Sequence, residues 1–108
     1  MPTRIDTGAQ LHHMIFGAVV AVLRDRAGLS QGSLARVGRT SQSTISRIED
    51  GRQKVDEYVA RSLDDALGNE LRAHVTKVEA AVQRALAKLD CEEPNEDLVR
   101  GLVRMMMR

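Results

Sequence analysis

Four consecutive polar residues, Ser41-Gln42-Ser43-Thr44, could bind a polyanion because they bring three hydroxyls and an amide together. We expect Ser41 to cap a helix over 42–50. The first turn of a helix offers free backbone N–H groups and a partial positive charge, which suit phosphates and the edges of bases. Ile45 and Ile48 would face inward, three residues apart. The residues then left on or near the outward side are Gln42, Ser43, Ser46 and Arg47.

Positive charge gathers around this expected helix. Between residues 30 and 54 the sequence has five basic residues against two acidic ones, whereas from residue 69 onward it has seven of each. The 108 residues together have a formal net charge of only +1. Cations concentrated on one segment favour contact with DNA, because neutralisation of phosphates dominates such binding. The competing interpretation is a solvated face of a structural helical hairpin.

The surrounding elements are expected to be helices. Ser30 can cap a short helix over 31–37, and a tight turn over 38–40 leads to the helix at 42–50, which together make a helix-turn-helix unit. A longer helix over 11–27 ends at Gly28, and a fourth over 56–67 ends at Gly68. Four residues of this fourth helix are expected to face inward: Val59, Leu63, Ala66 and Leu67.

The helix over 11–27 has two apolar stripes. One consists of Phe16, Val20, Leu23 and Ala27, and the other of Ile15, Val19 and Val22. Because a helix that is apolar on two faces needs two neighbours, another part of the chain or a second chain must cover the second stripe.

The segment 69–90 predicts a fifth helix with a heptad seam. The seam residues are Leu71, Val75, Val78, Val82, Ala85 and Leu89. This helix either folds back over the second stripe of the first helix or pairs with a second copy of itself, and the two arrangements can coexist. After Pro94, Asn95 can cap a terminal helix that carries Leu98, Leu102 and Met105 or Met106.

Composition agrees with a helical protein. Apolar residues make up 43% of the chain and aromatic residues only 2%, so the core must be aliphatic. We therefore expect an all-α fold: a five-helix repressor-like DNA-binding domain with a C-terminal helical extension. The expected division is a flexible arm over 1–10, a helix-turn-helix domain over 11–68, and an extension over 69–108 that serves dimerisation.

Other chemistries find little support in the sequence. The histidines lack acidic or thiol companions at metal-ligand spacing, and no phosphate-binding glycine loop, nucleophile elbow or pair of catalytic carboxylates appears. We expect no enzyme activity, no metal and no cofactor. The single cysteine, Cys91, suits a reducing cytoplasm, and the uncharged apolar run over 14–23 is too short to cross a bilayer.

The segment 16–68, about half of the chain, resembles the Cro/phage-repressor helix-turn-helix family, also called the xenobiotic-response-element family. The matching pieces, in order, are Leu23-Arg24, Gly28-Leu29-Ser30-Gln31, Leu34-Ala35, the run from Ser41 to Glu49, Gly51, and Ala66-Leu67-Gly68. Each piece alone is weak, but their common order and spacing make a strong signal.

The resemblance implies roles for individual residues. Gln42, Ser43 and Arg47 match the positions that read bases, and amide and guanidinium groups suit adenine and guanine respectively. Gln31 matches a glutamine that contacts a phosphate and braces the first residue of the recognition helix. The other expected phosphate contacts are Arg39, Thr44, Arg52 and Lys54. Arg24 and Glu49 match a pair that joins the first helix to the third by a largely buried ion pair.

Three positions depart from the family pattern. Arg39 stands where the turn usually has a left-handed glycine, with Gly38 one position earlier, so that either the turn is rebuilt or Arg39 is mildly strained. Ser33 replaces the usual glutamate of a capping box, and Val55 replaces a common proline.

The function expected from these features is that of a cytoplasmic transcriptional regulator, a dimeric repressor on an inverted-repeat operator. The alternative is an antitoxin or phage accessory protein whose C-terminal helices bind a partner protein and which uses DNA binding for autoregulation.

Overall fold

A computed structural model of the chain describes residues 9–89 and 95–107. Residues 1–8 of the expected arm, Cys91 and Pro94 lie outside the described residues. The described part contains the helices α1 (Ala9–Arg26), α2 (Gln31–Val37), α3 (Gln42–Glu49), α4 (Glu57–Ala66), α5 (Leu71–Lys88) and α6 (Glu96–Met106). The expected all-α fold is confirmed, because every regular element in these residues is a helix.

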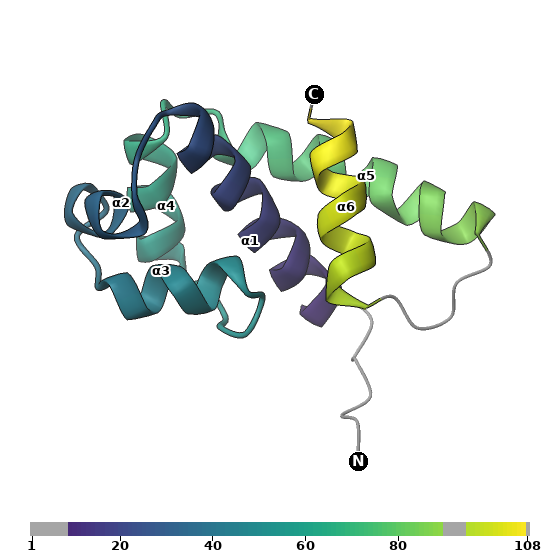
Figure 1. Cartoon of the computed structure of the whole chain (residues 1–108), viewed down its shortest axis with the longest axis horizontal. Helices are drawn as coiled ribbons and strands as arrows, with labels where there is room; N and C mark the ends of the chain where they lie inside the picture. The colour runs from purple at the N-terminus through teal and green to yellow at the C-terminus, as the bar shows by residue number, and fades with distance from the viewer. Residues whose placement is uncertain (1–8, 90–94, 108) are drawn as a thin grey trace, which may run out of the picture.

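Helix α1 is the centre of the molecule (Figure 1). It packs against α3 on one side and against α5 and α6 on the other. Both apolar stripes are therefore covered, and Ile15, Val19 and Val20 are completely buried. Ala27 is exposed instead of buried, because α1 ends at Arg26 and Gly28 takes a left-handed φ of 71°.

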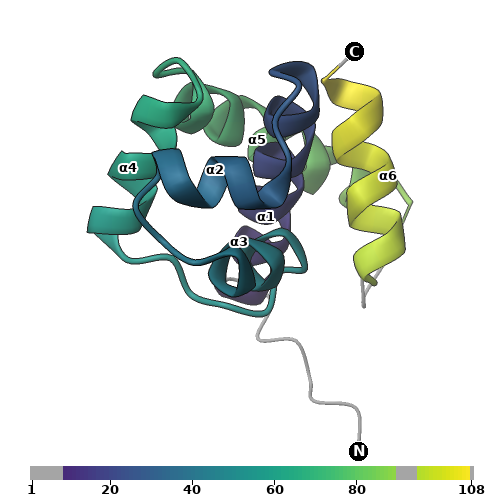
Figure 2. The same cartoon turned by 60° about the vertical axis from the view of Figure 1, so that its left-hand side comes forward.

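The helix-turn-helix unit forms as expected from its caps. The side chains of Ser30 and Ser41 each accept a hydrogen bond from a backbone N–H in the first turn of the helix they precede. Asp56, which was expected as the first residue of the fourth helix, caps α4 in the same way. In Figure 2, α2 lies across the front of the molecule, with α3 below it and α4 to its side. The buried side chains of Leu34, Ile45 and Leu63 tie the three helices to one core.

The heptad seam of α5 packs inside the single chain. Leu71, Val75, Val78 and Val82 are buried, and α5 contacts α1 and α6. Of the two arrangements left open by the sequence, the described residues adopt the one in which α5 folds back over α1. Pairing through these four residues would require α5 to leave its own core.

The end of the seam differs from the expected register. Leu89 is 60% exposed and Leu86 is buried in its place, while Ala85 is only partly buried. The reason is that α5 ends at Lys88, so that Leu89 lies beyond the last helical turn that faces the core.

Candidate nucleic-acid interface

Helix α3 has one apolar side and one polar side. Ile45 and Ile48 are buried against the core, at 0% and 1% exposure. The exposed residues at and after the start of the helix are Ser41, Gln42, Ser43 and Arg47, with Thr44 and Ser46 partly exposed. The polar residues selected from the sequence thus lie on the solvent side of one short helix.

Ser41 holds the first turn of α3. Its Oγ accepts a hydrogen bond from the backbone N–H of Thr44 at 3.1 Å, and the two hydroxyl oxygens are 2.8 Å apart. At the start of α2, Ser30 accepts from the N–H of Ser33 at 3.0 Å and donates its own hydroxyl to that of Ser33. Ser33 therefore keeps a contact with the cap although it replaces the family glutamate.

The two glutamines at the helix starts contact different neighbours. The amide nitrogen of Gln31 donates to Oε1 of Glu49 at 3.2 Å. The amide oxygen of Gln42 lies over Gly32, 3.5 Å from where a Cβ on that glycine would stand. Gln31 therefore braces Glu49 here, whereas Gln42 rests on the first turn of α2.

Arg47 is held by a residue that the sequence did not single out. Its Nε donates to Oε1 of Gln53 at 2.9 Å. Gly51, with a φ of 72°, turns the chain directly after α3, and the following loop brings Gln53 back beside the helix. Residues six positions apart across the end of a helix have no regular spacing that predicts a hydrogen bond. The contact of Gln53 with Arg47 is therefore visible only in the folded structure.

The expected phosphate-binding arginines and lysine are on the surface. Arg39 precedes α3, and Arg52 and Lys54 follow it; all three are exposed. Arg39 has a φ of 57°, so it occupies the left-handed position itself and the turn is not rebuilt around Gly38. A Cβ at Gly38 would lie 3.1 Å from both the Leu34 carbonyl oxygen and a methyl of Leu63, which explains a glycine there.

A buried ion pair joins α1 to α3. Arg24 donates through Nε to Oε2 of Glu49 at 2.8 Å and through Nη2 to Oε1 at 3.1 Å, and Glu49 is only 8% exposed. The Nη1 group donates to the Leu29 carbonyl oxygen at 2.9 Å. The hydrogen bond with Glu49 raises the pKa of Arg24, against the opposing effect of its burial. The paired hydrogen bonds fix α3 against α1.

A second ion pair links the end of α3 to the C-terminal helix. Arg100 Nη2 in α6 lies 3.4 Å from Asp50 Oδ1 and 3.6 Å from Glu96 Oε2. Arg100 offsets the negative charge of Asp50 at the end of α3. The positive charge of the basic residues around α3 is therefore reduced less by this carboxylate. Sequence reasoning missed Arg100, since no local pattern connects positions fifty residues apart.

The histidines are not grouped as metal ligands. His12 contacts Glu79 and His74 contacts Glu70. In the described ranges, 9–89 and 95–107, no three His, Cys, Asp or Glu residues could hold a metal ion together. None of the helices in these ranges has the length and apolar character needed to cross a membrane.

One family model matches the chain. It is described as a helix-turn-helix domain and covers residues 15–75, which is more than half of the sequence. The match begins within α1, contains α2, α3 and α4, and ends within the first half of α5. No curated protein and no solved structure is significantly similar to the chain.

Proposed function

Because the chain belongs to the helix-turn-helix domain family, we propose that it is a sequence-specific regulator that binds double-stranded DNA through α3. In this motif the second helix lies in the major groove and its N-terminal residues contact base edges. The observation that carries the proposal is the exposed polar first turn of α3, with exposed basic residues before and after it.

In the proposed complex, Gln42, Ser43 and Arg47 read bases. The amide of Gln42 suits the N6 and N7 edge of adenine, and the guanidinium of Arg47 suits O6 and N7 of guanine. Gln53 positions Arg47 through the hydrogen bond to Nε, which leaves the terminal guanidinium nitrogens to face the groove.

The remaining contacts are made to phosphates. We assign this role to Arg39, Thr44, Arg52 and Lys54, and to the backbone at the start of α2 around Gln31. Such contacts set the register of the protein on DNA without reading sequence. Arg24 and Glu49 act indirectly, by holding α3 at its angle to α1.

We further propose that two chains bind an inverted repeat and act as a repressor that excludes polymerase. One recognition helix reads few base pairs, whereas two helices related by a dyad read half-sites about 34 Å apart. Leu71, Val75, Val78 and Val82 of the α5 seam do not supply this contact in the described arrangement, because they are buried within one chain. We therefore propose that the two chains meet through a surface outside these four residues.

Selection of bound sites from random DNA duplexes tests the function directly. We expect an enriched inverted repeat whose affinity falls steeply with salt, because phosphate contacts release counterions. Recovery of no sequence preference at any salt concentration would contradict sequence-specific binding.

Two substitutions then separate the assigned roles. Arg47→Ala should cost about 1–3 kcal/mol on the selected site and relax the preference at one base position. Arg52→Ala should weaken binding to selected and random duplexes alike and reduce the salt slope by about 1. Arg84→Ala, an exposed position of α5, serves as the charge-matched control. Equal losses on both duplexes for Arg47→Ala and Arg52→Ala would contradict the assignment.

A further inference from the structure

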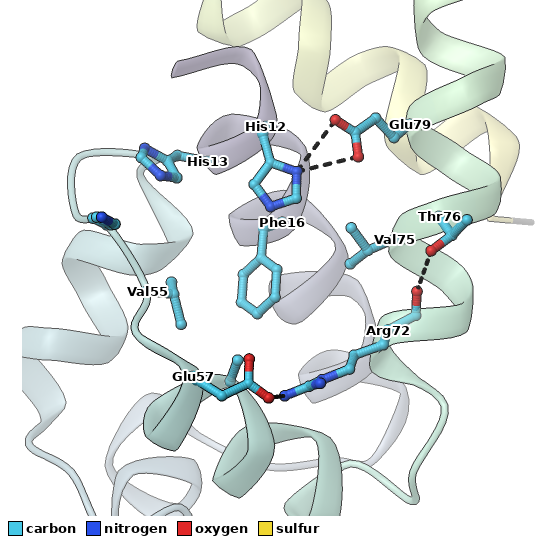
Figure 3. A pocket seen from close by; sticks show the side chains of 11 residues that line it. His12, His13, Phe16, Val55, Glu57, Arg72, Val75, Thr76 and Glu79 are labelled. Carbon is cyan, nitrogen blue, oxygen red and sulfur yellow. Dashed lines mark hydrogen bonds and ion pairs between the residues drawn. The ribbon is translucent and has the colours of Figure 1, made fainter. Parts of the chain in front are cut away.

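A pocket of about 450 Å³ opens on the surface between α1, α4, α5 and the segment that joins α3 to α4. Its apolar lining is formed by Phe16, Val55, Ala60 and Val75. Figure 3 shows the ring of Phe16 pointing into the space between Val55 and Val75. This volume lies within the range of roughly 300–1,000 Å³ that is typical of small-molecule sites.

Two ion pairs form opposite parts of the rim. His12 on α1 lies 3.1 Å from a carboxylate oxygen of Glu79 on α5, and Arg72 on α5 donates to Glu57 on α4 at 2.8 Å (Figure 3). The bond from Arg72 lowers the pKa of Glu57. Both carboxylates of the rim thus already have a hydrogen-bond partner.

The rest of the rim is basic. His13 and Lys54 line the pocket, and neither has a carboxylate partner among the residues that the structure describes. Burial lowers the pKa of His13, and the nearby charges of His12 and Lys54 lower it further. A bound anion at this place would offset the positive charge of Lys54 and favour the protonated form of His13.

We propose that the pocket binds a small carboxylate with an aromatic body. The ring of the ligand would pack on Phe16 between the two valines, and its carboxylate would face Lys54 and His13. A neutral ligand of the same shape would gain the apolar contacts but not the charge-assisted hydrogen bonds, which are roughly twice as strong as neutral ones.

The position of Lys54 makes this pocket a regulatory site, an extension that rests on the proposed function. Lys54 belongs to the loop that follows α3 and is one of the proposed phosphate contacts. A carboxylate that engages Lys54 competes with a DNA phosphate for the same ammonium group. Ligand therefore weakens DNA binding, and by linkage DNA weakens ligand binding by the same factor.

Phenylacetate is a suitable probe, with phenylacetamide as its neutral counterpart. Titration of the full chain, followed by NMR of the histidine ring protons, should show saturable shifts for His13 and a pKa of His13 raised by about one unit. His74, which lies outside this pocket, is the internal control and should not change. Phenylacetamide should bind about tenfold more weakly. No saturable shift at His13, or equal binding of the two compounds, would overturn the proposal.

The protonation of His13 gives the direction of the pH effect. Because the ligand carboxylate favours the charged imidazole, phenylacetate should bind more tightly at about pH 6 than at about pH 8. The other charged groups facing the pocket are His12, Lys54, Glu57, Arg72 and Glu79. A His13→Gln variant should lose most of this pH dependence; if it keeps the dependence in full, His13 does not contact the ligand.

Two variants test the lining and the charge separately. Ala60→Leu fills the apolar space and should abolish phenylacetate binding while leaving DNA affinity unchanged. Lys54→Gln should reduce phenylacetate affinity about tenfold, whereas Lys77→Gln, a lysine of α5 outside this pocket, should not. Melting curves establish that each variant folds. If Lys54→Gln binds phenylacetate as tightly as the unaltered chain, the charge assignment is wrong.

DNA affinity measured with and without phenylacetate tests the proposed regulation. Saturating phenylacetate should lower affinity for the selected duplex, with the largest effect at low salt, and should not do so in Ala60→Leu. If phenylacetate binds and DNA affinity stays constant, the coupling is refuted while the pocket and the proposed function both stand. If the chain binds no DNA under any condition, the proposed function fails, and the NMR result still decides on the pocket.

Discussion

Glu49 has more partners than any other residue of α3 described above. Its carboxylate accepts hydrogen bonds from Arg24 on α1 and from Gln31 on α2. Only 8% of Glu49 is exposed. Loss of either donor, the guanidinium of Arg24 or the amide of Gln31, would therefore leave the buried carboxylate with too few hydrogen-bond partners. The angle of α3 to the rest of the motif therefore depends on this group.

Replacement of Arg24 by Met should destabilise the chain by about 3 kcal/mol, because it leaves the carboxylate of Glu49 buried without its cation. Denaturant unfolding followed by circular dichroism measures the change. The matched control is Asp25→Asn, since Asp25 also contacts Arg24, at 3.4 Å, but its side chain is 71% exposed. We expect less than about 0.5 kcal/mol from that control. A similar loss from both variants would indicate that the buried pair contributes nothing special.

Arg39 shows how far residue-level prediction reaches. The family pattern has a left-handed residue at this position, so either Arg39 itself is left-handed or the turn is rebuilt. The φ of 57° confirms that Arg39 is left-handed. The sequence did not explain why the glycine stands at position 38. That explanation needs the side chain of Leu63 from α4, which a Cβ at Gly38 would meet in a tight contact of 3.1 Å.

At the scale of elements, the contact between α1 and α3 depends on Gly17. A Cβ added there would overlap with the carbonyl oxygen of Ile48, and would also lie 3.1 Å from the Cα of Glu49. The two helix backbones are therefore in direct contact at this point. Such closeness places Arg24, two turns further along α1, within reach of Glu49.

Gly17→Ala should destabilise the protein by several kcal/mol, even though alanine favours helices, because the two backbones must separate. Gly101→Ala in α6 is the matched control: it is exposed and its new methyl group would meet nothing within 4 Å. The control should stabilise the protein by about 0.5–1 kcal/mol through helix propensity alone. Thermal unfolding of the two variants measures both effects, and a stabilised Gly17→Ala would show that α1 and α3 lie further apart.

The elements themselves were predictable to within a few residues. The bounds of α2 agree with the expected 31–37. Helix α3 ends one residue earlier than expected, and α4 is one residue shorter at each end. Serine caps and glycines that can adopt a left-handed conformation are local signals, which is why they identify helix ends from sequence. The buried residues at the end of α5 were less well predicted, because tertiary packing places Leu86 in the core and leaves Leu89, the C-cap residue, exposed.

At the scale of the whole molecule, the C-terminal helices form part of one core with α1. Val99 and Val103 of α6 are completely buried, as are Leu71 and Val82 of α5. The family match also extends past residue 68 into α5. Residues 71–88 are therefore built into the fold of the single chain.

Val82→Asp tests how the seam is used. In the observed packing, the substitution buries a carboxylate without a partner and should unfold the chain. Leu89→Asp, at the exposed end of the same seam, should leave both the melting temperature and the molecular mass unchanged. Circular dichroism and light scattering measure the two properties. If Val82→Asp instead gave a folded monomer from a dimeric parent, the seam would join two chains.

The sequence by itself determined the helical class, the caps of the helix-turn-helix unit and the set of polar residues on the outer side of α3. These features depend on short-range periodicity and on residue types near one another in the chain. Only the tertiary structure decided that α5 covers its own α1, that Gln53 and Arg100 support α3, and that α1, α4 and α5 enclose a pocket. Those features depend on which helix faces meet in space, and many aliphatic faces of this chain could have packed against one another or against a second chain.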